Sequence, residues 1–177
     1  MSDERIETIR DKIGAYPDFP KPGILFRDIF SVLSDPPSFG VLIKLMEERI
    51  RKVCPEVDVI MGLESRGFVL GAPLALTLNK PFVPMRKKGK LPGKLKQVSY
   101  TLEYGTDVFE AQEDGIKKGE VVVIVDDLLA TGGTMSAAHE LVSSMGGKVA
   151  LCLVVIELTE LKGREKVNAP LETILKY

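Results

Sequence analysis

Residues 121–134 constrain the fold of this chain more than any other part of the sequence. The segment begins with five consecutive β-branched residues, 121–125, and such an apolar run is typical of a strand buried on both faces of a parallel sheet. We expect this strand to end at two carboxylates, Asp126 and Asp127. A turn of small residues follows, and the apolar spacing over residues 135–145 then predicts a helix.

The turn between the strand and the helix has the composition of an anion-binding site. Gly132 and Gly133 allow a ligand to approach the backbone N–H groups, and Thr131 and Thr134 add hydroxyl donors. Together with the start of a helix, these donors suit a phosphate group at the carboxyl end of a sheet. The chain contains neither G-x-x-x-x-G-K-[ST] nor G-x-G-x-x-G. An ordinary strand–turn–helix, with the Asp pair as a turn signal, is the alternative interpretation.

Length and composition favour one globular domain over residues 1–177. The net charge is −1, so no overall field attracts nucleic acid or a membrane surface, and we expect neither as a partner. Two isolated cysteines, Cys54 and Cys152, fit buried thiols better than a disulfide framework or a metal site. Because the first residues are charged and lack a signal-type apolar core, we expect a cytoplasmic location.

Strands and helices alternate along the rest of the chain. Apolar runs predict strands at residues 57–61, 81–85 and 148–156. Helical spacing predicts helices at residues 38–52, with Ser38 as the N-cap, and at residues 68–78. This alternation predicts an α/β fold with a largely parallel, twisted sheet flanked by helices.

Two further segments, residues 62–67 and 86–96, carry polar side chains suited to binding or catalysis. Ser65 lies in the first, but a serine nucleophile elbow requires glycine where Leu63 stands. The only histidine, His139, lies in a predicted helix, so a serine hydrolase is disfavoured. Residues 86–96 contain six basic and no acidic side chains, with glycines and a proline that favour a mobile loop. A nucleic-acid patch is the weaker interpretation, because no aromatic residue lies between the lysines.

Residues 121–134 resemble the signature of the type I phosphoribosyltransferase family: an apolar strand, two acidic residues, a small residue and then Thr-Gly-Gly-Thr. The resemblance implies that Asp126 and Asp127 bind the ribose hydroxyls of phosphoribosyl pyrophosphate (PRPP), with Asp127 also catalytic. It assigns the 5′-phosphate to Ala130, Thr131, Gly132, Gly133 and Thr134. It implies Mg²⁺ as a cofactor, held mainly by PRPP and water near Asp126. Members of this family form homodimers, so we expect a homodimer.

In the same family, a turn like residues 62–67 binds pyrophosphate and often contains a cis peptide bond. The corresponding bond here joins Glu64 and Ser65. A flexible catalytic loop follows in the family, and we expect it at about residues 86–105, where one basic residue can reach the neighbouring subunit's site. The resemblance assigns pyrophosphate binding to six residues of the two segments: Glu64, Ser65, Arg66, Arg86, Lys87 and Lys90.

Further segments resemble the branch of this family that acts on adenine, so the resemblance covers nearly the whole chain. They are residues 16–29, 62–68, 99–105 and 157–165. The resemblance implies an N-terminal hood at about residues 1–35, in which Phe26 stacks on the purine and Leu25 and Arg27 present backbone groups to its edge. Lys94 and Lys96 depart from the family pattern, which affects only how the loop closes.

The reaction that the resemblance implies is a step of purine salvage, in which adenine and PRPP give AMP and pyrophosphate. Glu103 is expected to manage the purine proton, and Tyr104 to close over the reacting centre. Two alternatives stay open, a sibling enzyme for another base and a PRPP-binding regulator. The apolar hood favours adenine, because oxo-bases usually need a charged side-chain donor. A regulator would usually carry an added DNA-binding domain or a strongly basic face.

Overall fold

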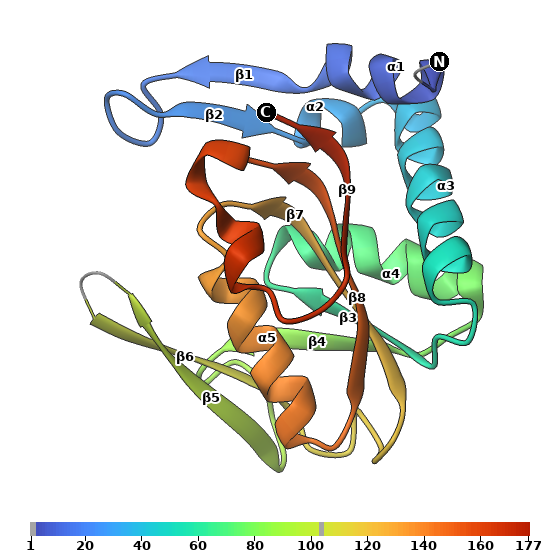
Figure 1. The fold of residues 1–177 in the computed structure, drawn as a ribbon, viewed down its shortest axis with the longest axis vertical. Coiled ribbons are helices and arrows are strands. Elements are labelled where there is room, and N and C mark those ends of the chain that lie inside the picture. The colour runs from blue at the N-terminus through green and yellow to red at the C-terminus, as the bar shows by residue number, and fades with distance from the viewer. Residues whose placement is uncertain (1–2, 103–104) are drawn as a thin grey trace. The chain divides into compact units, whose positions relative to one another are not determined.

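The structure is a computed structural model that describes residues 3–102 and 105–177 (Figure 1). The chain forms two compact units, Met1–Leu45 and Met46–Tyr177. A single domain over residues 1–177 therefore stays a prediction. The described elements of the first unit are α1 (Glu4–Lys12), β1 (Gly14–Pro17), β2 (Leu25–Asp28), α2 (Phe30–Leu33) and the start of α3 (Pro36–Val53).

Local hydrogen bonds set the helix starts in the first unit. Asp3 caps α1, because its side chain accepts a hydrogen bond from the Arg5 backbone N–H at 3.0 Å. At the start of α3, Asp35 Oδ2 accepts from the Ser38 backbone N–H at 3.1 Å. The prediction that Ser38 caps this helix is therefore wrong, and Asp35 takes that role from outside the first turn.

The second unit is built on a seven-stranded sheet in the order β5-β6-β4-β3-β7-β8-β9. Strands β4, β3, β7, β8 and β9 run parallel, whereas β5 and β6 pair antiparallel at one edge. The predicted α/β fold with a largely parallel sheet is confirmed. The elements are β3 (Val59–Leu63), α4 (Arg66–Leu78), β4 (Phe82–Lys87), β5 (Leu95–Leu102), β6 (Gly105–Gln112), β7 (Val121–Leu129), α5 (Gly133–Ser144), β8 (Lys148–Glu157), the 3₁₀ helices η1 (Thr159–Leu161) and η2 (Gly163–Lys166), and β9 (Leu171–Lys176).

Helices α4 and α5 cover opposite faces of this sheet (Figure 1). On β7, Val122 and Ile124 belong to a buried cluster that includes Leu141 of α5. Val123 and Val125 alternate to the other face and have no exposed surface. The apolar run is thus buried on both faces, as its composition predicts.

Strand β7 extends beyond its predicted end. Its pairing with β8 continues from Asp126, opposite Val154, to Leu129, opposite Glu157. The prediction that the strand ends at Asp126 and Asp127 is therefore wrong. Backbone pairing with β8 keeps both carboxylates within the sheet, which restricts their backbone more than a turn would.

The basic run at residues 86–96 is not one loop, as its composition suggested. Arg86 and Lys87 end β4, and Leu95 and Lys96 begin β5, so the loop itself spans residues 88–94. Antiparallel pairing of both strands with β6 accounts for the difference.

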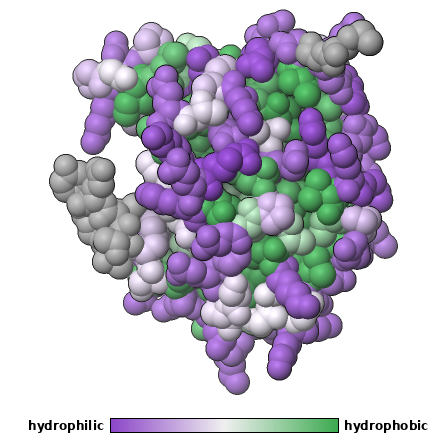
Figure 2. Space-filling model, viewed as in Figure 1, coloured by the Kyte–Doolittle hydropathy of each residue, from purple (hydrophilic) through white to green (hydrophobic). Residues whose placement is uncertain are grey.

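The face of the molecule shown in Figure 2 is mostly hydrophilic, with smaller hydrophobic areas between the polar side chains. One cluster of buried apolar residues in the second unit lies between the sheet and α5, and others are buried on the opposite face of the sheet. Of the helices that the structure describes, none combines the length and the hydrophobicity needed to cross a membrane.

Candidate active site

A cavity of about 410 Å³ lies where the carboxyl ends of β3, β4 and β7 approach the amino end of α5. Parallel α/β sheets commonly bind anionic ligands at such an edge. The structure brings the predicted pyrophosphate turn and the predicted phosphate loop together around this one space. The lining residues are Glu64, Ser65, Arg66, Lys87, Tyr100, Phe109, Asp126, Asp127, Leu128, Leu129, Ala130, Thr131, Gly132, Gly133, Thr134 and Met135.

The predicted phosphate loop, residues 130–134, joins β7 to α5. Helix α5 begins at Gly133, and the first N–H groups of a helix have no partner within it. Gly132 has a φ angle of +81°, in the region that favours glycine. A Cβ atom at Gly132 would also lie 2.3 Å from the carbonyl oxygen of Gly163. Glycine is therefore needed here for backbone conformation and for close packing.

Gly163, at the start of η2, packs closely against this loop. No role was predicted for it from the sequence. A Cβ atom on it would lie 2.2 Å from the carbonyl oxygen of Ala130 and 2.8 Å from the nitrogen of Gly132. Beside it, Arg164 donates from Nε and Nη2 to the Glu157 carboxylate at 2.8 and 2.7 Å, which fixes η2 to the end of β8. The signal that could have pointed to Gly163 is the family resemblance of residues 157–165, which contain it.

Asp126 and Asp127 lie side by side on β7, and Arg66 reaches them from the start of α4. Arg66 Nε donates a hydrogen bond to Asp127 Oδ2, and the Asp127 backbone N–H donates to Asp126 Oδ1 at 2.9 Å. The Asp127 side chain is only 7% exposed. Burial, together with the neighbouring Asp127 carboxylate, raises the pKa of Asp126 well above its usual range.

The four basic residues expected to bind pyrophosphate fall into two pairs. Arg66 and Lys87 line the cavity. Arg86 and Lys90 do not line it, and their Nη2 and Nζ atoms lie 2.9 and 2.8 Å from Glu64 Oε1. The peptide bond between Glu64 and the next residue is cis, as the resemblance implies. The Glu64 carboxylate thus neutralises Arg86 and Lys90. The backbone of Glu64, rather than its side chain, is suited to binding an anion.

Hydrogen bonds to cations also make Glu64 a strong acid. The bond from Arg86 is the largest cause, and with the bonds from Lys90 and the Lys87 backbone it outweighs burial and lowers the pKa of Glu64 from 4.5 to about 2. Because the folded-state pKa is depressed, these contacts stabilise the fold above pH 4.5 and lose that contribution as the pH falls toward 2.

We therefore expect Glu64→Gln to make the free energy of unfolding less dependent on pH between 4.5 and 2. The measurement is urea unfolding of wild type and variant at a series of pH values. Glu113→Gln is the matched control, because that carboxylate pairs with Lys96 at 3.3 Å with both side chains exposed. An equally steep loss of stability in Glu64→Gln and wild type would contradict the assignment.

The β5–β6 hairpin adds an aromatic wall to the cavity. Tyr100 stacks on Phe109 with ring centroids 4.8 Å apart and planes at 6°. The Tyr100 hydroxyl lies 3.4 Å from Asp107 Oδ2, and Lys87 Nζ lies 2.8 Å from the same oxygen. Asp107 therefore links the hairpin to a lysine that lines the cavity. No role was predicted for these hairpin residues, although Tyr100 lies within residues 99–105, one of the segments that carry the family resemblance.

The binding and catalytic roles predicted for the residues around the cavity stay predictions, and so do those of five other residues. Leu25, Phe26 and Arg27 form β2 of the first unit, where β2 pairs antiparallel with β1. Glu103 and Tyr104 lie outside the described residues.

Comparison with known proteins identifies the family to which the chain belongs. Residues 31–175 match the phosphoribosyl transferase domain. The chain is 50% identical over 176 residues to the adenine phosphoribosyltransferase of Drosophila pseudoobscura pseudoobscura, covering 99% of this chain and 97% of that protein. It is 47% identical over 179 residues to the adenine phosphoribosyltransferase of Rattus norvegicus, with 100% and 99% covered. The Saccharomyces cerevisiae enzyme, complexed with D-2,5-dideoxy-2,5-imino-altritol 1,6-bisphosphate and adenine, superimposes with a TM-score of 0.94 at 44% identity, over 97% of this chain and 99% of that one. The chain therefore belongs to the phosphoribosyltransferase family.

Proposed function

We infer that this protein transfers the phosphoribosyl group of PRPP to adenine, giving AMP and pyrophosphate. The observation that carries the inference is one cavity lined by the loop at residues 130–134, the Asp126–Asp127 pair, and the cations Arg66 and Lys87. A sugar with a phosphate at one end and a pyrophosphate at the other needs these groups. Two relatives at 47% and 50% identity are named for adenine, and a similar solved structure contains adenine, which supports that base as the acceptor.

The loop at residues 130–134 binds the 5′-phosphate through the backbone N–H groups at the start of α5 and the hydroxyls of Thr131 and Thr134. Hydrogen bonds to a charged group contribute roughly 1.5–3 kcal/mol each, so a few of them account for substantial affinity. Asp126 and Asp127 accept hydrogen bonds from the ribose hydroxyls.

Arg66 and Lys87 bind the pyrophosphate group from the cavity wall, and the backbone of Glu64 and Ser65 adds N–H donors. Arg86 and Lys90, which pair with Glu64, add positive charge next to this group. Among the described residues, Arg86 Nε is the buried side-chain polar atom that has no hydrogen-bond partner. A donor without a partner is costly when buried, so an anion beside it would be stabilising.

Mg²⁺ fits this site as a partner of the substrate. In the described part of the chain, no three His, Cys, Asp or Glu side chains are grouped closely enough to hold a metal ion by themselves. Mg²⁺ usually takes one or two carboxylates together with substrate phosphates and water, and the cavity offers the oxygens of Asp126 and Asp127. When bound, the ion would neutralise negative charge on the pyrophosphate.

In the reaction, the bond between the anomeric carbon and a pyrophosphate oxygen breaks, and a bond from that carbon to an imidazole nitrogen of adenine forms. Arg66 and Lys87 stabilise the negative charge that gathers on the leaving oxygen. Asp127, held by Arg66, positions the ribose next to the positive charge that develops on its ring. Glu103 takes up the purine proton, and Tyr104 closes over the reacting atoms to exclude water.

The adenine pocket is assigned to β2. Phe26 stacks on the base, and the backbone groups of Leu25 and Arg27 bond to its edge, which suits an uncharged purine. A cytoplasmic homodimer completes the proposal, with residues 1–177 acting as one domain.

We expect the purified protein with PRPP, adenine and Mg²⁺ to form AMP and pyrophosphate in equal amounts. The measurement is product analysis by chromatography, with hypoxanthine, xanthine and orotate as matched alternative acceptors. Failure to form AMP from adenine would defeat the proposal. Product from another base alone would instead assign the protein to a sibling reaction, and PRPP binding without any product would favour a regulator.

A further inference from the structure

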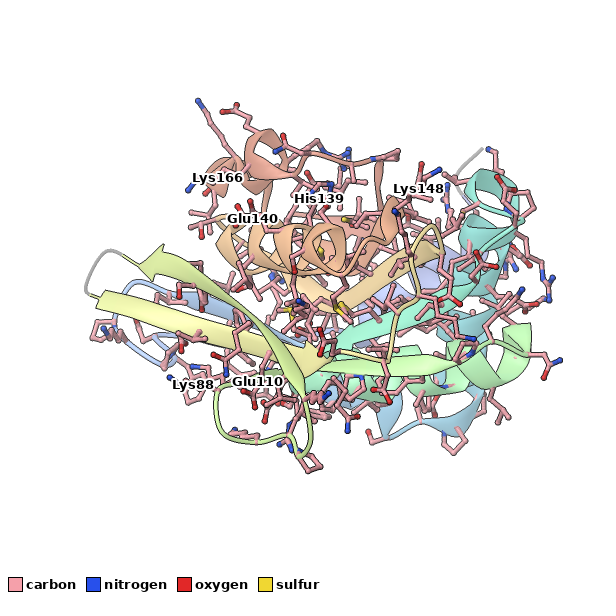
Figure 3. All side chains as sticks on the ribbon, turned by 90° about the horizontal axis from the view of Figure 1, so that it is seen from below. Lys88, Glu110, His139, Glu140, Lys148 and Lys166 are labelled. Carbon is pink, nitrogen blue, oxygen red and sulfur yellow. The ribbon has the colours of Figure 1, made fainter. Side chains whose placement is uncertain are left out.

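Glu110 is a buried carboxylate that the proposed reaction does not use. It lies on β6 opposite Arg86 of β4 and has no exposed surface. Figure 3 labels Glu110 on β6 and Lys88 at the start of the loop at residues 88–94. The loop, rather than the protein core, covers this carboxylate, because its hydrogen-bond partners come from the loop and from β5.

The backbone of the loop wraps around the Glu110 carboxylate. The N–H groups of Lys90 and Leu91 donate to Oε1 at 2.9 and 3.1 Å, and Gln97 Nε2 donates to Oε2 at 3.1 Å. Burial opposes the charged form, but these bonds and one from the Gly89 backbone outweigh it and lower the pKa of Glu110. Successive N–H groups of this kind often bind an external anion, and here they bind one of the protein's own.

The same loop orients two cations of the proposed pyrophosphate site. The Lys90 carbonyl oxygen accepts a hydrogen bond from Arg86 Nη1 at 3.1 Å. Lys90 Nζ and Arg86 Nη2 lie 2.8 and 2.9 Å from Glu64 Oε1. Without Glu110, the loop would lose the bonds that set the direction of the Lys90 carbonyl and the place of its ammonium group.

We propose that Glu110 is a positioning residue for pyrophosphate, which holds the loop at residues 88–94 so that Arg86 and Lys90 stay beside Glu64, a residue that lines the cavity. The inference rests on the proposed function, because it assumes that these cations meet the pyrophosphate group of PRPP. Glu110 does not line the cavity, so it acts through the loop. A merely structural role would change stability and all kinetic constants together, whereas positioning changes those for PRPP selectively.

The test compares Glu110→Met, which fills the space with only a weakly accepting sulfur, with Glu110→Gln, which keeps one acceptor oxygen. We expect the KM for PRPP and the Kd for Mg²⁺–pyrophosphate to rise about tenfold in Glu110→Met, equivalent to about 1.4 kcal/mol, and roughly threefold in Glu110→Gln. The KM for adenine should stay at the wild-type value. Glu113→Gln, on the turn after β6, is the control and should match wild type.

A second arm tests whether Glu110 acts through Lys90. In a Lys90→Ala background, Glu110→Met should raise the KM for PRPP by a smaller factor than it does in wild type. The reason is that Glu110 acts on PRPP binding through the position of Lys90. Unchanged PRPP constants in both Glu110 variants, or fully additive effects with Lys90→Ala, would overturn the inference.

Two further outcomes are also decisive. If Glu110→Met does not fold, Glu110→Gln decides alone, and a PRPP constant equal to that of wild type overturns the inference. A wild-type protein that makes no AMP overturns the proposed function and this inference with it. Active wild type with unaffected variants overturns the inference alone.

Discussion

We expect Asp127→Asn to lower kcat for AMP formation by about a hundredfold or more, with only a small change in the thermal unfolding midpoint. The variant removes the negative charge that we propose positions the ribose, and it ends the ion pair with Arg66. It also relieves the repulsion that raises the pKa of Asp126, which offsets part of the stability lost. The Arg66 side chain is 33% exposed, so water can solvate it in the variant.

The measurements for Asp127→Asn are steady-state kinetics and thermal unfolding of the same preparation. Glu172→Gln is the control, because it neutralises a carboxylate that pairs with Arg49 at 3.5 Å away from the cavity-lining residues. The control should keep the wild-type kcat. Wild-type turnover in Asp127→Asn, or a loss of activity fully explained by unfolding, would remove Asp127 from the mechanism.

Gly163→Ala is expected to have the second large effect, by moving the phosphate loop without touching the substrate. The added methyl group would lie 2.2 Å from the Ala130 carbonyl oxygen, and the bonds from Arg164 to Glu157 hold η2 so that it cannot easily withdraw. Overpacking of this kind typically costs 1–3 kcal/mol, so we expect about that loss of stability. The displaced loop should raise the KM for PRPP by roughly tenfold or more, because its N–H groups no longer converge on the phosphate.

Gly40→Ala is the matched control for Gly163→Ala. No atom lies within 4 Å of a Cβ built on Gly40, which is in α3, so alanine should stabilise the helix by up to about 1 kcal/mol and leave the KM for PRPP unchanged. Kinetics at saturating adenine and urea unfolding would measure both effects. A Gly163→Ala protein with the PRPP constants of wild type would show that η2 does not position the loop.

The parts of the site that adjoin each other in the sequence could be predicted well. The strand at residues 121–125, the loop at residues 130–134 and the helix after them follow from local patterns of apolar residues and glycine. The end of β7 could not be predicted in this way, because its pairing with β8 depends on residues more than twenty positions away. The cap of α3 was misplaced for a different reason, since Asp35 and Ser38 are both good caps.

The sequence by itself determined the class of fold, the phosphate loop with its acidic pair, and the presence of a cationic segment. Only the tertiary structure distinguished the cations of that segment, which look equivalent along the chain. Lys87 lines the cavity and pairs with Asp107, whereas Arg86 and Lys90 contact Glu64. The physical reason is that each carboxylate partner comes from another strand or turn, so the pairing depends on how the sheet is assembled. The close packing of Gly163 on the phosphate loop arises in the same way.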